Sequence, residues 1–246
     1  MRRILTSEQA ARAIYFDFEG CKDEAPSLLG WSFQRDDGTE HFRQRVVEPA
    51  LWSAKHAVPH TGGTVRCSKM TLAAAVNRLV TIAEEQDRLI VSWARHDLKM
   101  IEQHVGDARV VRRAQARHRN ALPTVRQWLQ RSRPDVVLSR TWGGKHRLAR
   151  YREIMGIPVP EKYDQDVAAK GIRAVRTAIA RHGRYSSIPS DDSARRAWKA
   201  VLGHNRLDCR DARVIVTLAA AEYVALALGV GDACSAPSSV ERSIRT

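Results

Sequence analysis

The first third of the chain alternates hydrophobic and polar residues in short runs that predict an antiparallel β-meander. Half-buried strands show this alternation between turn residues, and three runs fit: residues 13–18, 28–33 and 40–47. Asp36-Asp37-Gly38 separates the second run from the third and is typical of a hairpin turn. Residues 48–70 contain Pro49, Pro59 and a Gly62-Gly63 pair, which predict an irregular loop.

Beyond this loop the hydrophobic residues recur at helical spacing, and a strand and a second helix follow. Leu72, Val76 and Leu79 share one helix face. Residues 89–93 are apolar and predict a buried strand, and a helix is expected at about 97–104. A meander followed by alternating helices and strands predicts an α/β fold, in which helices flank a mixed β-sheet of antiparallel meander and parallel strands.

The second half of the chain is predicted to be mainly helical and to end in a flexible tail. The expected helices cover residues 123–131, 148–155, 164–181 and about 194–228, with Gly203 as a candidate break in the last one. We expect residues 1–228 to form a single domain with a helical insertion at about 160–193. The small and polar residues 229–246 are expected to fray.

The number of cysteines and the length of the apolar runs indicate in which compartment the protein is expected. Four cysteines without a C-x-x-C pair are too few for a disulfide framework in a chain of 246 residues. No apolar run reaches the length of a signal peptide or of a membrane span. The expectation is a cytoplasmic protein without a membrane partner.

The net charge is strongly positive and is concentrated in one segment. Lys and Arg number 41 against 27 Asp and Glu, for a formal net charge of +14. Residues 109–152 hold twelve Arg and one Lys against a single acid, Asp135. A coding bias would explain the preference for Arg over Lys, but not the net charge. Such an excess favours a polyanionic partner such as nucleic acid.

Asp17 and Glu19 are predicted to project together from the first strand, because residues two apart in a strand point to the same face. Adjacent carboxylates repel each other and destabilise a buried strand unless a cation neutralises them. The alternative is that the strand ends in an ordinary polar turn at Glu19-Gly20.

Two further candidate sites lie later in the chain. Asp97 falls near the start of an expected helix, where it is either a functional acid or a helix N-cap. His204 and Asp208 are four residues apart and share a helix face, as a functional pair or as a surface pair. A histidine one turn from an aspartate can deprotonate a water while the aspartate holds a metal. Asp211 is the alternative acid on that face.

The order of these motifs resembles that of the DEDD-type 3′–5′ exonucleases, the DnaQ-like superfamily with a ribonuclease H-like fold. The matching segments are Phe-Asp-Phe-Glu-Gly around Asp17 and Glu19, Trp-Ala-Arg-His-Asp-Leu-Lys-Met-Ile around Asp97, and His-Asn-Arg-Leu-Asp-Cys-Arg-Asp-Ala around Asp208. The resemblance covers roughly residues 13–228. It is closest to predicted ribonuclease H-like nucleases whose last motif reads Tyr-Asn-x-x-Asp-Cys. Here His204 stands where that branch has Tyr, four residues before Asp208.

The resemblance implies a metal-dependent 3′–5′ exonuclease that hydrolyses phosphodiester bonds at DNA or RNA ends, single-stranded ends above all. Asp17, Glu19, Asp97 and Asp208 would be catalytic and would bind two Mg²⁺ or Mn²⁺ ions, which prefer hard oxygen ligands. His204 would complete the catalytic set by orienting the attacking water and helping to deprotonate it.

The Arg-rich segment would provide the nucleic-acid contacts, since guanidinium groups bind phosphate without sequence choice. The expected nucleic-acid-binding residues are Arg112, Arg113, Arg117, Arg119, Arg140, Trp142, Lys145 and Arg147. Trp128, Trp142 and Tyr151 are candidates for stacking on bases, although Trp128 also fits the buried face of a helix.

Two other interpretations stay open. The first is a non-catalytic nucleic-acid-binding protein on the same fold. The second is a basic partner-binding protein whose motifs are coincidental, and it predicts that the four acids do not converge in space. DNA and RNA, and terminal and internal cleavage, are open alternatives, as is the oligomeric state.

Overall fold

The computed structural model describes residues 4–55, 57–60, 63–136, 138, 147–158 and 167–227 of the chain. The strands are β1 (Ile14–Glu19), β2 (Leu28–Gln34), β3 (Glu40–Val46), β4 (Ala57–His60), β5 (Gly63–Lys69), β6 (Ile90–Ser92) and β7 (His118–Asn120). The α-helices are α1 (Ser7–Arg12), α2 (Leu72–Glu85), α3 (Arg95–His104), α4 (Ala108–Arg117), α5 (Leu122–Ser132), α6 (Leu148–Ile154), α7 (Val167–His182) and α8 (Ser193–Ala227). Two short 3₁₀ helices are η1 (Pro49–Ala54) and η2 (Tyr185–Ser187).

The strands form one mixed sheet in the order β4-β5-β3-β2-β1-β6-β7. The predicted meander is present, because β1, β2 and β3 pair antiparallel to one another. Strands β6 and β7 extend the other edge of β1 in parallel. The predicted α/β class with a mixed sheet flanked by helices is therefore confirmed, and it is consistent with a ribonuclease H-like arrangement.

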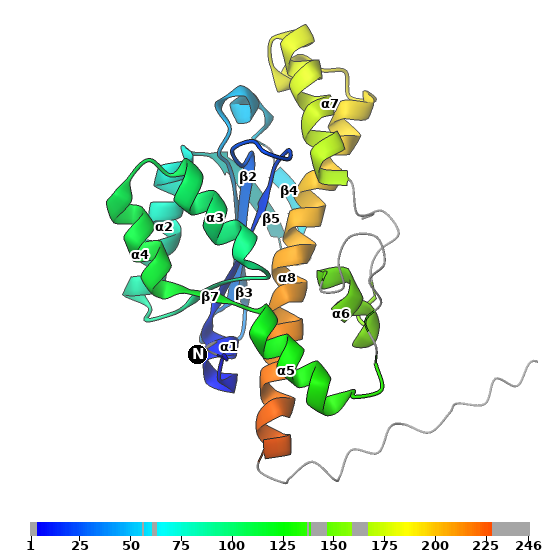
Figure 1. Ribbon diagram of the computed structural model, residues 1–246. Helices are drawn as coiled ribbons and strands as arrows, with labels where there is room; N and C mark the ends of the chain where they lie inside the picture. Colours follow the sequence, from blue (N-terminus) through cyan, green and yellow to red (C-terminus); the bar gives the residue numbers. More distant parts are fainter. Residues whose placement is uncertain are drawn as a thin grey trace, which may run out of the picture.

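The alternation of side chains along β1 divides the core into two layers. Ile14 and Phe16 pack against helices α2, α3 and α4 on one face of the sheet. Tyr15 points to the other face, where it joins residues of α1, α5 and α8. Figure 1 shows α2, α3 and α4 on one side of the strands and α5, α6 and α8 on the other. Asp17 and Glu19 alternate with the same period as Tyr15, so their side chains lie on the face of β1 that is turned towards α8.

Helix α8 is the longest element and runs past most of the others. Its 35 residues correspond to a length of about 50 Å. It packs on β1, β2, α1, α5, α6 and α7. The candidate break at Gly203 is absent, because a helical glycine costs only about 1 kcal/mol. Buried side chains before and after it, such as Trp198 and Ile215, hold the helix straight through that point.

Several elements differ from the sequence prediction. The segment 48–70, expected to be an irregular loop, contains η1 and the β4–β5 hairpin. Pro59 is accommodated because β4 is the outermost strand of the sheet. Helices α1 and α4 and strand β7 were not predicted, and arginines obscure the short apolar stripe of Val110 and Ala114 in α4. The expected helices near 97–104, 123–131, 148–155 and 164–181 match α3, α5, α6 and α7 to within a few residues.

The segment predicted to be a helical insertion contains α7 and η2. Helix α7 packs against the N-terminal part of α8, with Ile172 and Val175 in a core shared with Trp198 and Val201. The predicted flexible tail, residues 229–246, lies outside the described residues. Within the described ranges, no helix combines the length and the apolar composition that a membrane span requires.

Candidate metal centre

Strand β1 presents Asp17 and Glu19 to helix α8, as their spacing predicts. Phe18, between them, packs on the opposite layer with Phe16. Glu19 is buried, with 7% of its surface exposed, and Asp17 is partly buried. These carboxylates therefore do not belong to a solvated turn, and the ordinary-turn alternative does not describe Glu19.

Helix α8 brings His204 and Asp208 to the same place. The Nε2 atom of His204 lies 4.0 Å from Oε1 of Glu19 and 3.6 Å from Oδ2 of Asp208. One potential ligand atom from each of Glu19, His204 and Asp208 lies within 4.8 Å of the other two. This cluster, which we call the Glu19 cluster, could hold a metal ion.

Asp97 joins the site from the first turn of α3. The N-cap of this helix is Ala94, so the interpretation of Asp97 as a helix cap is wrong. Its side chain is buried, and the backbone N–H groups of Phe18 and of Asp97 itself donate hydrogen bonds to it. The charge of Asp97 is close enough to raise the pKa values of Asp17 and Glu19.

The electrostatics of the four acids favour a bound cation. Burial, and then the charges of Glu19, Asp97 and Asp208, raise the pKa of Asp17 well above its ordinary value. Burial and the charges of Asp208 and Asp97 do the same for Glu19. Burial raises the pKa of Asp97 to about 7.

The donor set also fits a hard divalent cation. Oε1 of Glu19 is buried and has no hydrogen-bond partner. Buried polar atoms are normally satisfied, so an unpaired carboxylate oxygen among other acids is a position that a cation would fill. Carboxylate oxygens are the ligands that Mg²⁺ and Mn²⁺ prefer.

Asn205, which the sequence analysis did not single out, orients Asp17. Its Nδ2 donates to the backbone oxygen and to Oδ2 of Asp17, both at 3.0 Å. Its Oδ1 accepts a hydrogen bond of 3.0 Å from Gln44 of β3. Gly30, paired with Asp17 across the sheet, leaves the space for this amide, since a Cβ there would lie 1.9 Å from Asn205 Oδ1. A lone glycine in an apolar strand is the signal that such a close approach leaves in a sequence.

Arg152, predicted only as part of the basic segment, is a buried member of this site. Its Nη2 lies 2.5 Å from Oδ1 of Asp208, and its Nε lies 2.6 Å from Oδ2 of Asp211. The other oxygen of Asp208 is the one that faces His204. Asp211, the alternative acid, is also paired with Arg210. It is therefore a partner of arginines rather than a free ligand.

A cavity of about 630 Å³ lies beside Glu19, between the loop after β1 and helix α3. Lys22, His96 and Met100 are among its lining residues. Its volume is in the range of sites that bind ligands the size of a nucleotide.

The basic segment is divided between ion pairs and exposed positions. Arg113 pairs with Glu84 at 2.5 Å, Arg117 pairs with Asp87 at 2.6 Å, and Arg119 donates to the His118 backbone oxygen. Arg112 is exposed on α4, and Arg147 directly precedes α6. Arg140, Trp142 and Lys145 lie outside the described residues. Nucleic-acid contact by these residues stays a prediction.

Base stacking by Trp128 or Tyr151 does not agree with the structure. Trp128 is 1% exposed and donates to Glu222 at 2.6 Å, and Tyr151 is fully buried against Trp93. Both rings belong to the core under α8. The helical face of Trp128 correctly indicated burial, whereas the surrounding arginines misled the interpretation of Tyr151.

Replacing Gly30 with alanine tests the close packing of the Asn205 side chain against Gly30. We expect Gly30→Ala to lower the free energy of unfolding by about 1–3 kcal/mol, because the new methyl group displaces the Asn205 amide. Gly106→Ala is the control, since a Cβ at Gly106 meets nothing within 4 Å. Urea denaturation measures both variants. Equal stability of Gly30→Ala and wild type would contradict the close approach.

Removing Arg152 tests the buried ion pairs. We expect Arg152→Gln to cost about 3–5 kcal/mol of stability, because it removes the buried guanidinium from Asp208 and Asp211 and leaves buried Asp211 with the partly exposed Arg210 alone. Arg150→Gln, on the same helix, removes an exposed pair with Glu153 and should cost at most about 1 kcal/mol. If the loss of a buried charge partner is the cause, adding Asp211→Asn to Arg152→Gln restores part of the stability in denaturation experiments. Equal losses in Arg152→Gln and Arg150→Gln would refute the assignment.

The raised pKa of Asp97 predicts a pH-dependent stability without metal. The folded pKa of about 7 exceeds the ordinary 3.8, so the folded state binds more protons between these values. In EDTA, Asp97 therefore contributes its full share to the free energy of unfolding below about pH 4. Between about pH 4 and pH 7 this share falls by up to about 1.4 kcal/mol per pH unit. Asp97→Asn should flatten this fall in denaturation measured from pH 4 to 8. An identical pH slope in wild type and variant would contradict the buried carboxylate.

Comparison of the chain with protein-family models, with curated protein sequences and with solved structures finds no match. What the protein does is therefore inferred from the residues that meet at the end of β1 and from the chemistry that they support.

Proposed function

We propose that this protein is a metal-dependent nuclease that hydrolyses phosphodiester bonds at the 3′ ends of DNA or RNA. The observation that carries the proposal is the meeting of Asp17, Glu19, Asp97 and Asp208 beside His204 on three separate elements. Such a concentration of buried and partly buried, mutually repelling acids destabilises the fold and is expected where function requires it.

The four acids would hold two Mg²⁺ or Mn²⁺ ions. When bound, the ions would polarise the phosphodiester and lower the pKa of a bound water. Asn205 keeps the carboxylate of Asp17 in one orientation through its hydrogen bond to Oδ2. His204 presents Nε2 to Glu19 and Asp208, where it can take a proton from a water near these carboxylates.

Features around the site support a nucleic-acid substrate. The cavity beside Glu19 has the size needed for a terminal nucleotide. The net charge of +14 favours binding of a polyanion, with an affinity that falls as salt rises.

One observation favours the alternative of a non-catalytic nucleic-acid-binding protein. Arg152 is within 2.5 Å of Oδ1 of Asp208 and neutralises part of the negative charge that a cation would otherwise balance. In this alternative, Arg152 substitutes for one metal ion and the remaining acids serve only to shape the site.

Degradation of 5′-labelled single-stranded oligonucleotides distinguishes the two. With Mg²⁺ or Mn²⁺, we expect DNA, RNA or both to give a ladder that shortens from the 3′ end, and EDTA to abolish it. Asp17→Asn should lower the rate at least about a hundredfold, because removing one ligand charge weakens both binding of the ions and stabilisation of the reaction. Glu8→Gln, which neutralises an exposed carboxylate on α1, is the matched control and should leave the rate unchanged.

Absence of metal-dependent cleavage in wild type, with salt-sensitive binding retained, would favour the non-catalytic alternative. Cleavage that survives Asp17→Asn would show that another group is responsible.

A further inference from the structure

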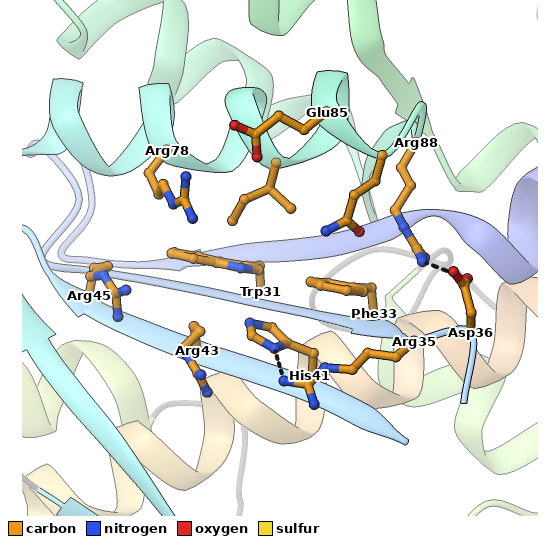
Figure 2. Close-up of a pocket in the computed structure, with 12 residues that line it drawn as sticks. Trp31, Phe33, Arg35, Asp36, His41, Arg43, Arg45, Arg78, Glu85 and Arg88 are labelled. Carbon is orange, nitrogen blue, oxygen red and sulfur yellow. Dashed lines mark hydrogen bonds and ion pairs between the residues drawn. The ribbon is translucent and has the colours of Figure 1, made fainter. Parts of the chain in front are cut away.

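A second cavity lies on the face of the sheet opposite to the Glu19 cluster. It has a volume of about 570 Å³ and lies between helix α2 and strands β2 and β3. Trp31 and Phe33 of β2 form its floor, and Arg43 and Arg45 of β3 lie along one side. Figure 2 shows Arg78 reaching towards them from α2. Alternation places these arginines here, because the intervening Phe42 and Gln44 of β3 are buried on the side of α8.

The cavity carries more positive charge than its own acids balance. Five arginines line it against two acids, Asp36 and Glu85. Two of the arginines have structural roles. Arg88 donates to the backbone oxygens of Arg12 and Gln34, and Arg35 forms a hydrogen bond with His41.

The other three arginines are available for a ligand. Arg43 and Arg45 each donate to the backbone oxygen of the preceding residue, and neither forms an ion pair within the described ranges. Arg78 is exposed, and among the described residues it has neither a hydrogen bond nor an ion pair. Burial and neighbouring arginines lower the pKa of Arg45, and they lower the pKa of His41 to about 4.

Two buried donors at this cavity also have no partner. Trp31 is 1% exposed, and its Nε1 forms no hydrogen bond. The guanidinium of Arg45 lies over the Trp31 ring at 5.1 Å, and its Nε is buried and unpaired as well. Unpaired buried donors beside mutually repelling cations are stabilised by an anion that accepts several hydrogen bonds.

We propose that this cavity binds the phosphate group of a nucleotide, with Arg43, Arg45 and Arg78 as its principal ligands. A phosphate group offers the negative charge and the acceptor oxygens that three guanidinium groups and an indole N–H require. The volume accommodates the attached nucleoside, whose base can stack on a guanidinium plane. A free nucleotide and a nucleic-acid strand present the same chemistry. The site is on the other face of the sheet, so it does not depend on the proposed nuclease activity.

Binding measured in EDTA tests this cavity separately from the metal centre. Isothermal titration calorimetry measures the affinity for inorganic phosphate and AMP. Fluorescence anisotropy measures the affinity for labelled ten-nucleotide DNA and RNA. We expect Arg43→Gln/Arg45→Gln to weaken binding at least about tenfold. Arg78→Gln, on an exposed helix surface where misfolding is not expected, should weaken it about three- to tenfold. Arg173→Gln/Arg181→Gln, which removes two exposed charges from α7, should have little effect.

Each outcome has a defined meaning. Loss of AMP binding in the cavity variants supports a site for a free nucleotide, and loss confined to oligonucleotides supports a site for a strand. The proposal is overturned if wild type binds none of the probes in EDTA, or if Arg78→Gln and Arg43→Gln/Arg45→Gln bind as wild type does. It is also overturned if the α7 variant loses as much affinity, since net charge alone would then explain binding. If the protein does not cleave oligonucleotides but binds them through these arginines, the proposed nuclease function is wrong and the proposed phosphate site is supported.

Discussion

The repulsion among four carboxylates at the end of β1 is the constraint on which the surrounding structure depends. Burial and like charge both disfavour the ionised forms of Asp17 and Glu19. The protein keeps these acids together through contacts from different elements. Asn205 donates to Asp17, backbone N–H groups donate to Asp97, and Arg152 pairs with Asp208. A cluster of buried acids that needs such support is typical of a functional site.

The packing of helix α8 against the rest of the fold fixes the position of the site residues that it carries. It packs on strands β1 and β2 and on four helices, α1, α5, α6 and α7. It also carries His204, Asn205 and Asp208 on the turns that face β1. The Gly30 gap in β2 allows the helix to approach the strand closely enough for Asn205 to reach Asp17. The geometry of the site is therefore set by packing between α8 and the sheet rather than by a flexible loop.

The fold class and the acids Asp17, Glu19 and Asp208 were predictable from sequence because they follow local periodicity, whereas Asp97 was singled out through the family resemblance. Alternation predicted that Asp17 and Glu19 share a face, and helical spacing predicted that His204 and Asp208 do. The pair of Gly30 and Asn205 was missed because the two residues are 175 positions apart, and a glycine in an apolar strand indicates a close approach without saying which residue makes it. Arg152 was hidden among eleven other arginines of its segment, which gave no sign that one of them is buried. The arginine-lined cavity joins residues of two strands and α2, so no single stretch of sequence contains its pattern.

We infer that the Glu19 cluster and its neighbouring acids form a site for divalent cations. Electron paramagnetic resonance of free Mn²⁺, titrated into the protein at neutral pH, measures this directly. We predict saturable binding in wild type and at least tenfold weaker binding in Glu19→Gln, which keeps the shape of the side chain and removes its charge. Mn²⁺ binding of equal affinity in wild type and Glu19→Gln, with both proteins folded, would contradict the account.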